Sequence, residues 1–159
     1  VSSAHPDVAE LLASVLSGVE QLDARSKVLA ERADHLAGYL GRTNVAAIHA
    51  ELEQLRQRAE RTQSSETREQ YDRIIGTRRQ QLAAIADISA ALERAHAQIL
   101  RIRATFEGLS ARILRLSALD ADARSEATGG MNEELDEVHR DLEAFEEVLR
   151  ELRPAATNA

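Results

Sequence analysis

The 159-residue chain has no cysteine or tryptophan, and it has only two prolines, two tyrosines and two phenylalanines. Without cysteine it cannot form disulfides, thiolate zinc sites or iron–sulfur clusters. The shortage of aromatic rings leaves Leu, Ile, Val and Ala to build a core, and these residues suit repetitive helix packing. Pro6 and Pro154 stand near the two ends, so residues 7–153 lack the residue that most strongly breaks helices. No apolar run approaches the roughly 20 residues that a membrane-spanning helix needs.

Apolar residues recur at alternating intervals of three and four, which places them on one side of a helix and is typical of coiled coils. The first such stripe runs from Val8 to Leu40, with Ser26 as its one polar member. Pro6 suits the first turn of this helix, and Gly41 suits a left-handed residue that closes it. The spacing therefore predicts a first helix over residues 6–40.

A second stripe runs from Val45 to Thr62 and predicts a helix over residues 44–62, capped by Thr43 or Asn44. The stripe then changes phase and resumes at Tyr71 and Ile74, which one continuous helix cannot present on the same face. Two positions suit the break. Ser65, a possible cap, is favoured over Gly76.

The third stripe predicts a long helix over residues 66–118. A polar segment and the Gly129-Gly130 pair follow, and glycines are expected to end any helix that precedes them. The last stripe predicts a helix over residues 131–152. The expected fold is all-α, an elongated antiparallel coiled-coil or helical bundle of about four helices.

The charges favour one pairing within this bundle. Basic residues outnumber acidic ones in 77–119, and the reverse holds in 120–159. Opposite charges beside the seam favour the fourth helix lying antiparallel on the second half of the third. The first helix has two possible positions: antiparallel to the second helix, or in line with it beside the third.

We expect residues 1–159 to form a single helical coiled-coil domain, with 154–159 as a loose tail. Because the chain begins with Val1 rather than Met and is rich in Ala and Arg, we interpret it as a fragment of a larger bacterial protein.

Few residues suggest chemistry. The glycines match no phosphate-binding pattern. Glu93 with His96, and Asp136 with His139, have the spacing of ligand pairs in di-iron helical bundles. Both pairs flank the predicted seams, so we interpret them as solvated surface groups. We expect no catalytic, cofactor-binding or metal-binding residues, no cofactor and no enzyme activity.

The candidate interaction residues are the apolar positions of the seams. They are Leu12, Val15, Val19, Leu22, Leu29, Leu36, Ile85, Leu92, Ile99, Ile102, Phe106, Leu109, Ile113, Leu116, Leu135, Val138, Leu142, Phe145 and Leu149.

These features favour a non-catalytic protein–protein interaction module, such as a coiled-coil scaffold, spacer or oligomerisation domain. We expect protein partners, a homo-oligomer with a dimer favoured, and a cytoplasmic location. The first alternative is a peripheral membrane-binding helical-hairpin protein that uses the arginine-rich third helix, and the second is a metal-binding helical bundle. Nucleic acid is not expected as a partner, because the net charge of −7 repels polyanions and no aromatic residues alternate with the arginines.

Overall fold

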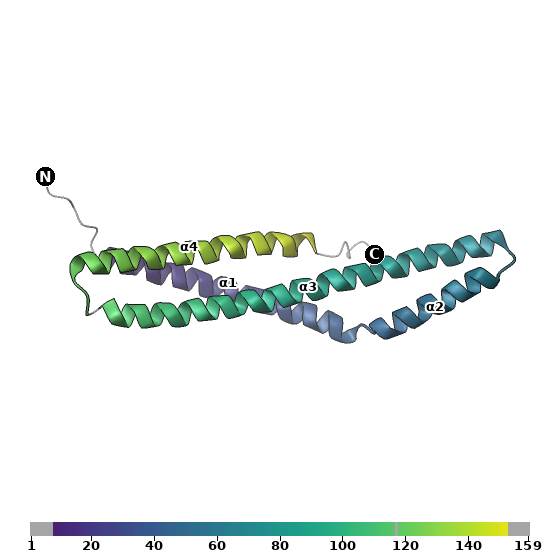
Figure 1. Ribbon diagram of the computed structural model, residues 1–159, viewed down its shortest axis with the longest axis horizontal. Helices are drawn as coiled ribbons and strands as arrows, with labels where there is room; N and C mark the ends of the chain where they lie inside the picture. Colours follow the sequence, from purple (N-terminus) through teal and green to yellow (C-terminus); the bar gives the residue numbers. More distant parts are fainter. Residues whose placement is uncertain (1–7, 117, 153–159) are drawn as a thin grey trace. The chain divides into compact units, whose positions relative to one another are not determined.

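The computed structural model describes residues 8–116 and 118–152 and places four helices in them (Figure 1). They are α1 (Val8–Arg42), α2 (Val45–Arg61), α3 (Ser65–Leu116) and α4 (Ala121–Glu151). The described residues contain no strand, and the helices pack against one another, which confirms the all-α helical bundle. Contacts divide the chain into two compact units. Unit 1 comprises the described residues up to Arg32 and from Arg94 onward, and unit 2 comprises Ala33–Glu93.

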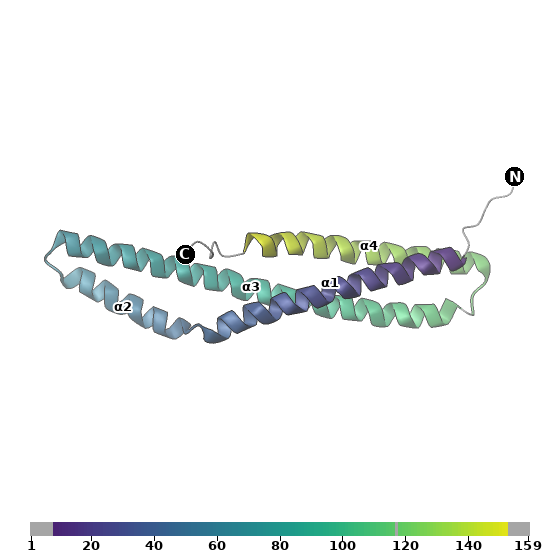
Figure 2. The same cartoon turned by 180° about the vertical axis from the view of Figure 1, so that it is seen from behind.

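Unit 1 is a bundle of three helical segments: the first part of α1, the last part of α3, and α4. Ser14 donates to Asn132 at 3.3 Å and Arg25 donates to Glu146 further along, so α1 and α4 run parallel (Figure 2). Arg101 pairs with Asp141, and Arg112 pairs with Glu134, so α4 runs antiparallel to α3. The predicted packing of the fourth helix on the second half of the third is therefore confirmed.

The core of unit 1 is apolar apart from Thr128, at 0% exposure, and Thr105, at 7%. Its apolar side chains buried to about 2% exposure or less are Val15, Leu22, Leu29, Ala95, Ile102, Leu109, Met131, Leu135, Val138, Leu142 and Phe145. They come from all three segments, so each helix contributes the stripe that the sequence pattern indicates.

Unit 2 is built around α2, which lies antiparallel on the first part of α3. Leu52 and Leu55 of α2 pack with Ile75 of α3, and the half-buried Tyr71 and Leu82 complete this cluster. The last residues of α1 continue into α2 and do not fold back on it (Figure 1). Within unit 2, α2 therefore has α3 as its partner, and the arrangement in which the first helix folds back antiparallel on the second is not the one observed.

Polar side chains cap the helices at both ends of α2, one at a predicted position and one at the residue before it. Asn44 Oδ1 accepts a hydrogen bond from Ala47 N at 3.0 Å, which confirms Asn44 as the cap. The break between α2 and α3 lies at residues 62–64, and α3 continues through Gly76, so the favoured position is confirmed. The capping residue is Ser64, whose Oγ accepts from Thr67 N at 3.2 Å, and not Ser65.

The prediction that the fourth helix begins at residue 131 is wrong, since α4 begins at Ala121. Asp120 caps it by accepting a hydrogen bond from Ala123 N at 2.8 Å. Gly129-Gly130 lies inside the helix, and no described glycine has a positive φ. Each glycine costs a helix about 1 kcal/mol relative to Ala. Thr128 and Met131 on either side are fully buried, and this burial offsets the cost.

The predicted closure of the first helix by a left-handed Gly41 is also wrong, because α1 includes Gly41 and ends at Arg42. Thr43 closes the helix instead: its N–H donates to Leu40 O and its hydroxyl to Tyr39 O. The expected start at Pro6 and the expected tail 154–159 lie outside the described residues. The prediction of a single domain stays a prediction.

Candidate interaction surface

Most of the predicted seam residues pack inside the chain. Those that are buried are Val15, Leu22, Leu29, Ile85, Ile102, Leu109, Leu116, Leu135, Val138, Leu142, Phe145 and Leu149. Those that are half-buried are Leu12, Val19, Leu36, Leu92, Ile99, Phe106 and Ile113. The buried set holds the helices of each unit together and therefore offers no surface to another molecule.

The seam of α3 is rotated from the predicted stripe in both units. In unit 2, Ile75 is 7% exposed whereas Ile74, the predicted seam residue, is 42% exposed. In unit 1 the buried face includes Thr105 and leaves Phe106 half-buried. In unit 1, α3 packs against two helices, so its buried face is wider than a two-stranded seam and is centred differently. In unit 2, Ile75 is the residue that packs against Leu52 and Leu55 of α2.

A polar network fixes α1 against α4 in unit 1. Arg25 donates from Nε and Nη2 to the two carboxylate oxygens of Glu146, at 3.4 and 3.2 Å. Its Nη1 lies 3.1 Å from His139 Nδ1, and His139 Nε2 lies 3.2 Å from the carbonyl oxygen of Gly18. These contacts are all satisfied when Nε2 carries the ring proton, since His139 then donates to Gly18 and accepts from Arg25.

The same network decides the role of His139. Both of its ring nitrogens face groups of α1, so the Asp136–His139 pair does not present the free nitrogen that a metal ion needs. Glu93 and His96 are both exposed on α3. Within residues 8–116 and 118–152, no three His, Asp or Glu side chains are grouped to hold a metal ion.

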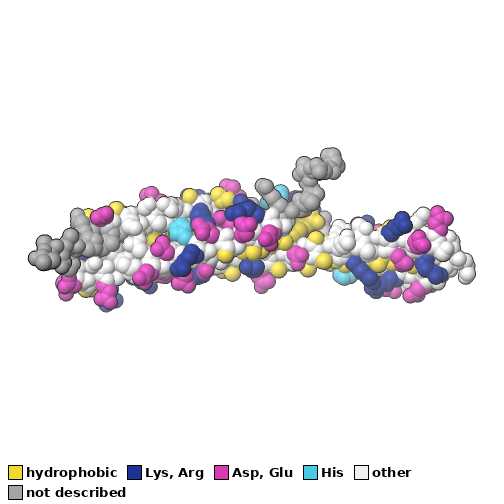
Figure 3. Space-filling model, turned by 90° about the horizontal axis from the view of Figure 1, so that it is seen from above, with side chains coloured by type: hydrophobic (Ala, Val, Ile, Leu, Met, Phe, Trp, Pro, Cys, Tyr) yellow, Lys and Arg dark blue, Asp and Glu magenta, His cyan; other side chains and the backbone are white. Residues whose placement is uncertain are grey.

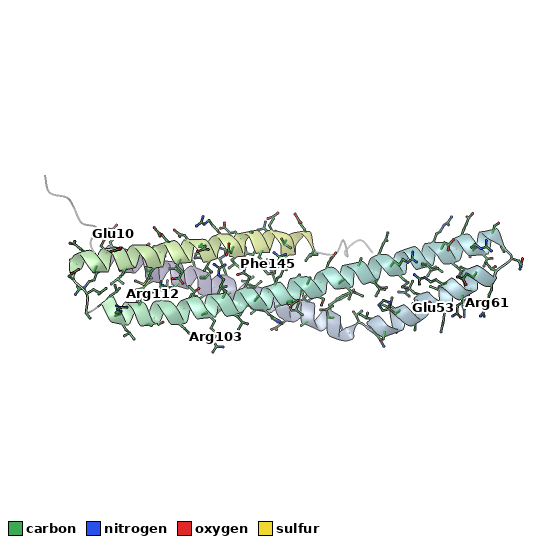
Figure 4. The ribbon with its side chains drawn as sticks, in the orientation of Figure 1. Glu10, Glu53, Arg61, Arg103, Arg112 and Phe145 are labelled. Atoms are coloured by element: carbon green, nitrogen blue, oxygen red, sulfur yellow. The ribbon has the colours of Figure 1, made fainter. Side chains whose placement is uncertain are left out.

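Ionic contacts join the arginines of α3 to α4. Arg101 pairs with Asp141 and, at 3.5 Å, with Glu137, and Arg112 pairs with Glu134. The guanidinium carbon of Arg94 lies 5.2 Å from the ring centroid of Phe145, within the range of a cation–π interaction. Arg103 differs from these, because it points away from α4 (Figure 4) and pairs with Glu107 of its own helix at 3.3 Å.

The side of α3 that faces away from the unit 1 core carries a second, mostly apolar stripe, in which Glu107 is the one polar member. Its members recur at intervals of three and four, and all are exposed; they are Ala97, Leu100, Ala104, Glu107, Ala111 and Leu114. We call them the outer face of α3. Leu114 is 78% exposed and Leu100 is 64% exposed, more than the other large apolar side chains in the described residues.

The outer face is not among the predicted seams, because the prediction assigns one apolar stripe to each helix and the buried seam of α3 is the more continuous of its two stripes. The signal was nevertheless present. Ala97, Ala104 and Ala111 are seven residues apart, and Leu100 and Leu114 keep the same phase. A helix with apolar stripes on two sides has two faces able to pack, of which unit 1 uses one.

The surface of unit 1 also has a shallow depression of about 580 Å³ where α3 meets the start of α4. It is lined by Arg112, Arg115, Leu116, Leu119, Ala127, Gly130 and Glu134. Arg112 and Glu134 are already paired, and the lining contains no hydroxyl or imidazole to act as a nucleophile or base. No reaction is assigned to it.

The chain was compared with known protein families, curated proteins and solved structures. No protein family, curated protein or solved structure shows significant similarity to the chain. No helix in the described residues is long and apolar enough to cross a bilayer. On the face shown in Figure 3, basic and acidic side chains are interspersed, so no extended surface of one sign stands out there.

Proposed function

We propose that the chain is a non-catalytic protein–protein interaction module, a helical scaffold that joins protein chains through an exposed helix face. One observation carries the proposal: Leu100 and Leu114 are exposed on a single face of α3, although the unit 1 core is already closed by three helices. Apolar side chains aligned on one helix face, outside a complete core, are typical of helix-to-helix docking. A cytoplasmic location in a bacterium is part of the same proposal.

The charges of α3 favour a protein over a membrane as the partner. Binding to anionic lipid needs arginines that are free to meet phosphates. Arg101 and Arg112 are paired with acidic residues of α4, and Arg94 lies over Phe145. Arg103 is paired with Glu107. At these four arginines, lipid headgroups would have to displace existing contacts before they gained new ones.

Flotation with vesicles that contain about 30% phosphatidylserine tests this choice, since Debye screening is weak at low salt. We expect the protein to stay with the soluble fraction at low and at physiological salt. Flotation with the vesicles at low salt that declines as salt is added would overturn the proposal in favour of the membrane-binding alternative. Elemental analysis of the purified protein tests the metal-binding alternative, and stoichiometric iron, manganese or zinc would favour it.

A further inference from the structure

We infer that the outer face of α3 binds a second copy of the chain, with the two α3 segments antiparallel. This inference rests on the proposed function and names its partner. It concerns Ala97, Leu100, Ala104, Glu107, Ala111 and Leu114, all of them in unit 1.

The order of large and small side chains on the outer face is self-complementary. If two copies meet around the point between Thr105 and Phe106, Leu100 of one copy lies opposite Ala111 of the other. Leu114 then lies opposite Ala97 by the same symmetry. Each leucine is matched to an alanine, so a large side chain fills the space that a small one leaves.

The same register brings opposite charges together. Glu107 lies opposite Ala104 of the second copy and within one residue of its Arg103. Arg103 donates only Nε to Glu107 of its own helix, so its Nη groups can reach the carboxylate of the second copy. Two arginines and two glutamates then surround the two-fold axis with no net charge. In a parallel pair, Glu107 would face Glu107 and repel it.

The charged centre also explains why the stripe is interrupted once. A single polar position in an apolar seam lowers stability but fixes direction and register. Glu107 is the polar member of the outer face, and it lies next to the symmetry point. Alanine at three of the six positions allows the helix axes to approach to about 8 Å, the lower end of the usual range.

Cysteine crosslinking tests the geometry, since the natural chain has no cysteine and each variant therefore has one thiol. In the antiparallel pair, residue 104 of the two copies is offset by about 4.5 Å along the axis, at 1.5 Å per residue. The offset is about 16 Å for residue 111 and about 26 Å for residue 97. A disulfide spans a Cα separation of roughly 4–7 Å. We expect A104C to form a crosslinked dimer on mild oxidation, and A97C and A111C to form no intermolecular disulfide in the same assay.

Light scattering tests the surface itself. Ala104→Arg places a long charged side chain in the middle of the outer face, and we expect it to raise the dimer dissociation constant at least tenfold. Ala144→Arg is the matched control, because Ala144 is also an exposed helical alanine of unit 1, on α4. Circular dichroism should show equal helix content for both variants, and the control should dimerise as the natural chain does.

Three outcomes would overturn the inference: a monomer at all concentrations, crosslinking of all three cysteine variants, or a dimer that A104R leaves intact. The vesicle assay shows whether the proposed function is overturned as well. A monomer that ignores anionic vesicles overturns only the second copy as partner. A monomer that floats with vesicles at low salt overturns the interaction module too.

Discussion

Units 1 and 2 are built from the same kind of stripe, yet their cores are closed to different degrees. In unit 1, Leu22 and Leu142 are fully buried, at 0% exposure. In unit 2, the central pair Leu52 and Leu55 keep 6% and 8% exposure. Around Leu52 and Leu55 the two helices leave a small part of each side chain exposed, whereas in unit 1 a third helix covers that part. Heptad spacing thus specifies which residues turn inward, and the number of neighbouring helices decides how completely they are buried.

The two units also differ in where polar groups meet. In unit 2, Arg78 lies in the helix interface, donates to Glu51 at 2.9 and 3.2 Å, and donates to Gln81 at 2.9 Å. In unit 1, the network of Arg25, His139 and Glu146 lies beside an apolar core. A polar pair within an interface fixes register but contributes little net stability when it is partly exposed. Unit 2 is therefore expected to be the less stable of the two.

The largest effect should come from truncating a core leucine in each unit. Leu142→Ala in unit 1 leaves a cavity that three helices enclose, so we expect a loss of about 3–5 kcal/mol. Leu52→Ala in unit 2 lies beside solvent that can fill the space, so we expect about 2 kcal/mol. Hydrogen exchange followed by mass spectrometry measures both, since it reports local opening separately for peptides of each unit. Equal losses in the two units would contradict the comparison.

A smaller effect should come from the glycines. A Cβ added at Gly76 of unit 2 meets nothing within 4 Å, so Gly76→Ala should stabilise α3 by about 0.5–1 kcal/mol through helix propensity. A Cβ added at Gly18 of unit 1 would lie 3.1 Å from Leu135 Cδ1. Leu135 is buried and would have to move, together with the histidine contact to the Gly18 carbonyl. Gly18→Ala should therefore bring no stabilisation, or a loss of about 1 kcal/mol.

Gly129→Ala separates the effect of helix propensity from the effect of close packing. Gly129 lies in unit 1, as Gly18 does, but a Cβ there has no neighbour within 4 Å. We expect it to stabilise the protein as Gly76→Ala does, measured by the midpoint of urea unfolding. Stabilisation by Gly18→Ala of the same size would show that close packing of α1 on α4 does not require a glycine.

Sequence periodicity was sufficient to predict the helix content and most of the buried positions, because the side of a helix that becomes buried is set by its local sequence. It was insufficient where tertiary contacts override local preference. Gly129-Gly130 has poor helix propensity, and the burial of Thr128 and Met131 on either side of it offsets that cost, so that α4 continues through it. The choice of Ile75 over Ile74 likewise depends on where α2 lies, which no local pattern states.

The candidate surface was predictable only in part. The seam residues were identified correctly as apolar positions, but most are used inside the chain, which spacing alone does not reveal. The contact between Arg25 and His139 joins residues 114 apart, so it depends on the parallel placement of α1 and α4. The outer face of α3 was readable from its spacing, and only the structure shows that the three-helix core leaves it exposed.

The smallest effect on stability is expected from removing an exposed ion pair of the surface, and this effect should be the same in the two units. Asp23 accepts a hydrogen bond from Lys27 Nζ at 2.8 Å, and this contact, with the attraction of the carboxylate charge, raises the pKa of Lys27. When the pKa of a lysine is higher in the folded state than in the unfolded state, its contact stabilises the fold fully at pH values below the unfolded-state pKa. This stabilisation is lost as the pH rises through the folded-state pKa. The stabilisation by the Asp23–Lys27 contact is therefore lost only at alkaline pH, above about pH 10. Both groups are solvated.

Asp23→Asn should lower the pKa of Lys27 and leave the urea midpoint at neutral pH nearly unchanged, because an exposed i,i+4 pair contributes little. Lys27 is the one lysine of the chain, so its side-chain NMR signal can be followed without assignment through the titration. Glu69→Gln, which removes the corresponding exposed pair with Arg73 in unit 2, is the control and should leave the pKa of Lys27 as it is. If either substitution moved the urea midpoint as far as Leu52→Ala does, surface charge as well as core closure would separate the two units.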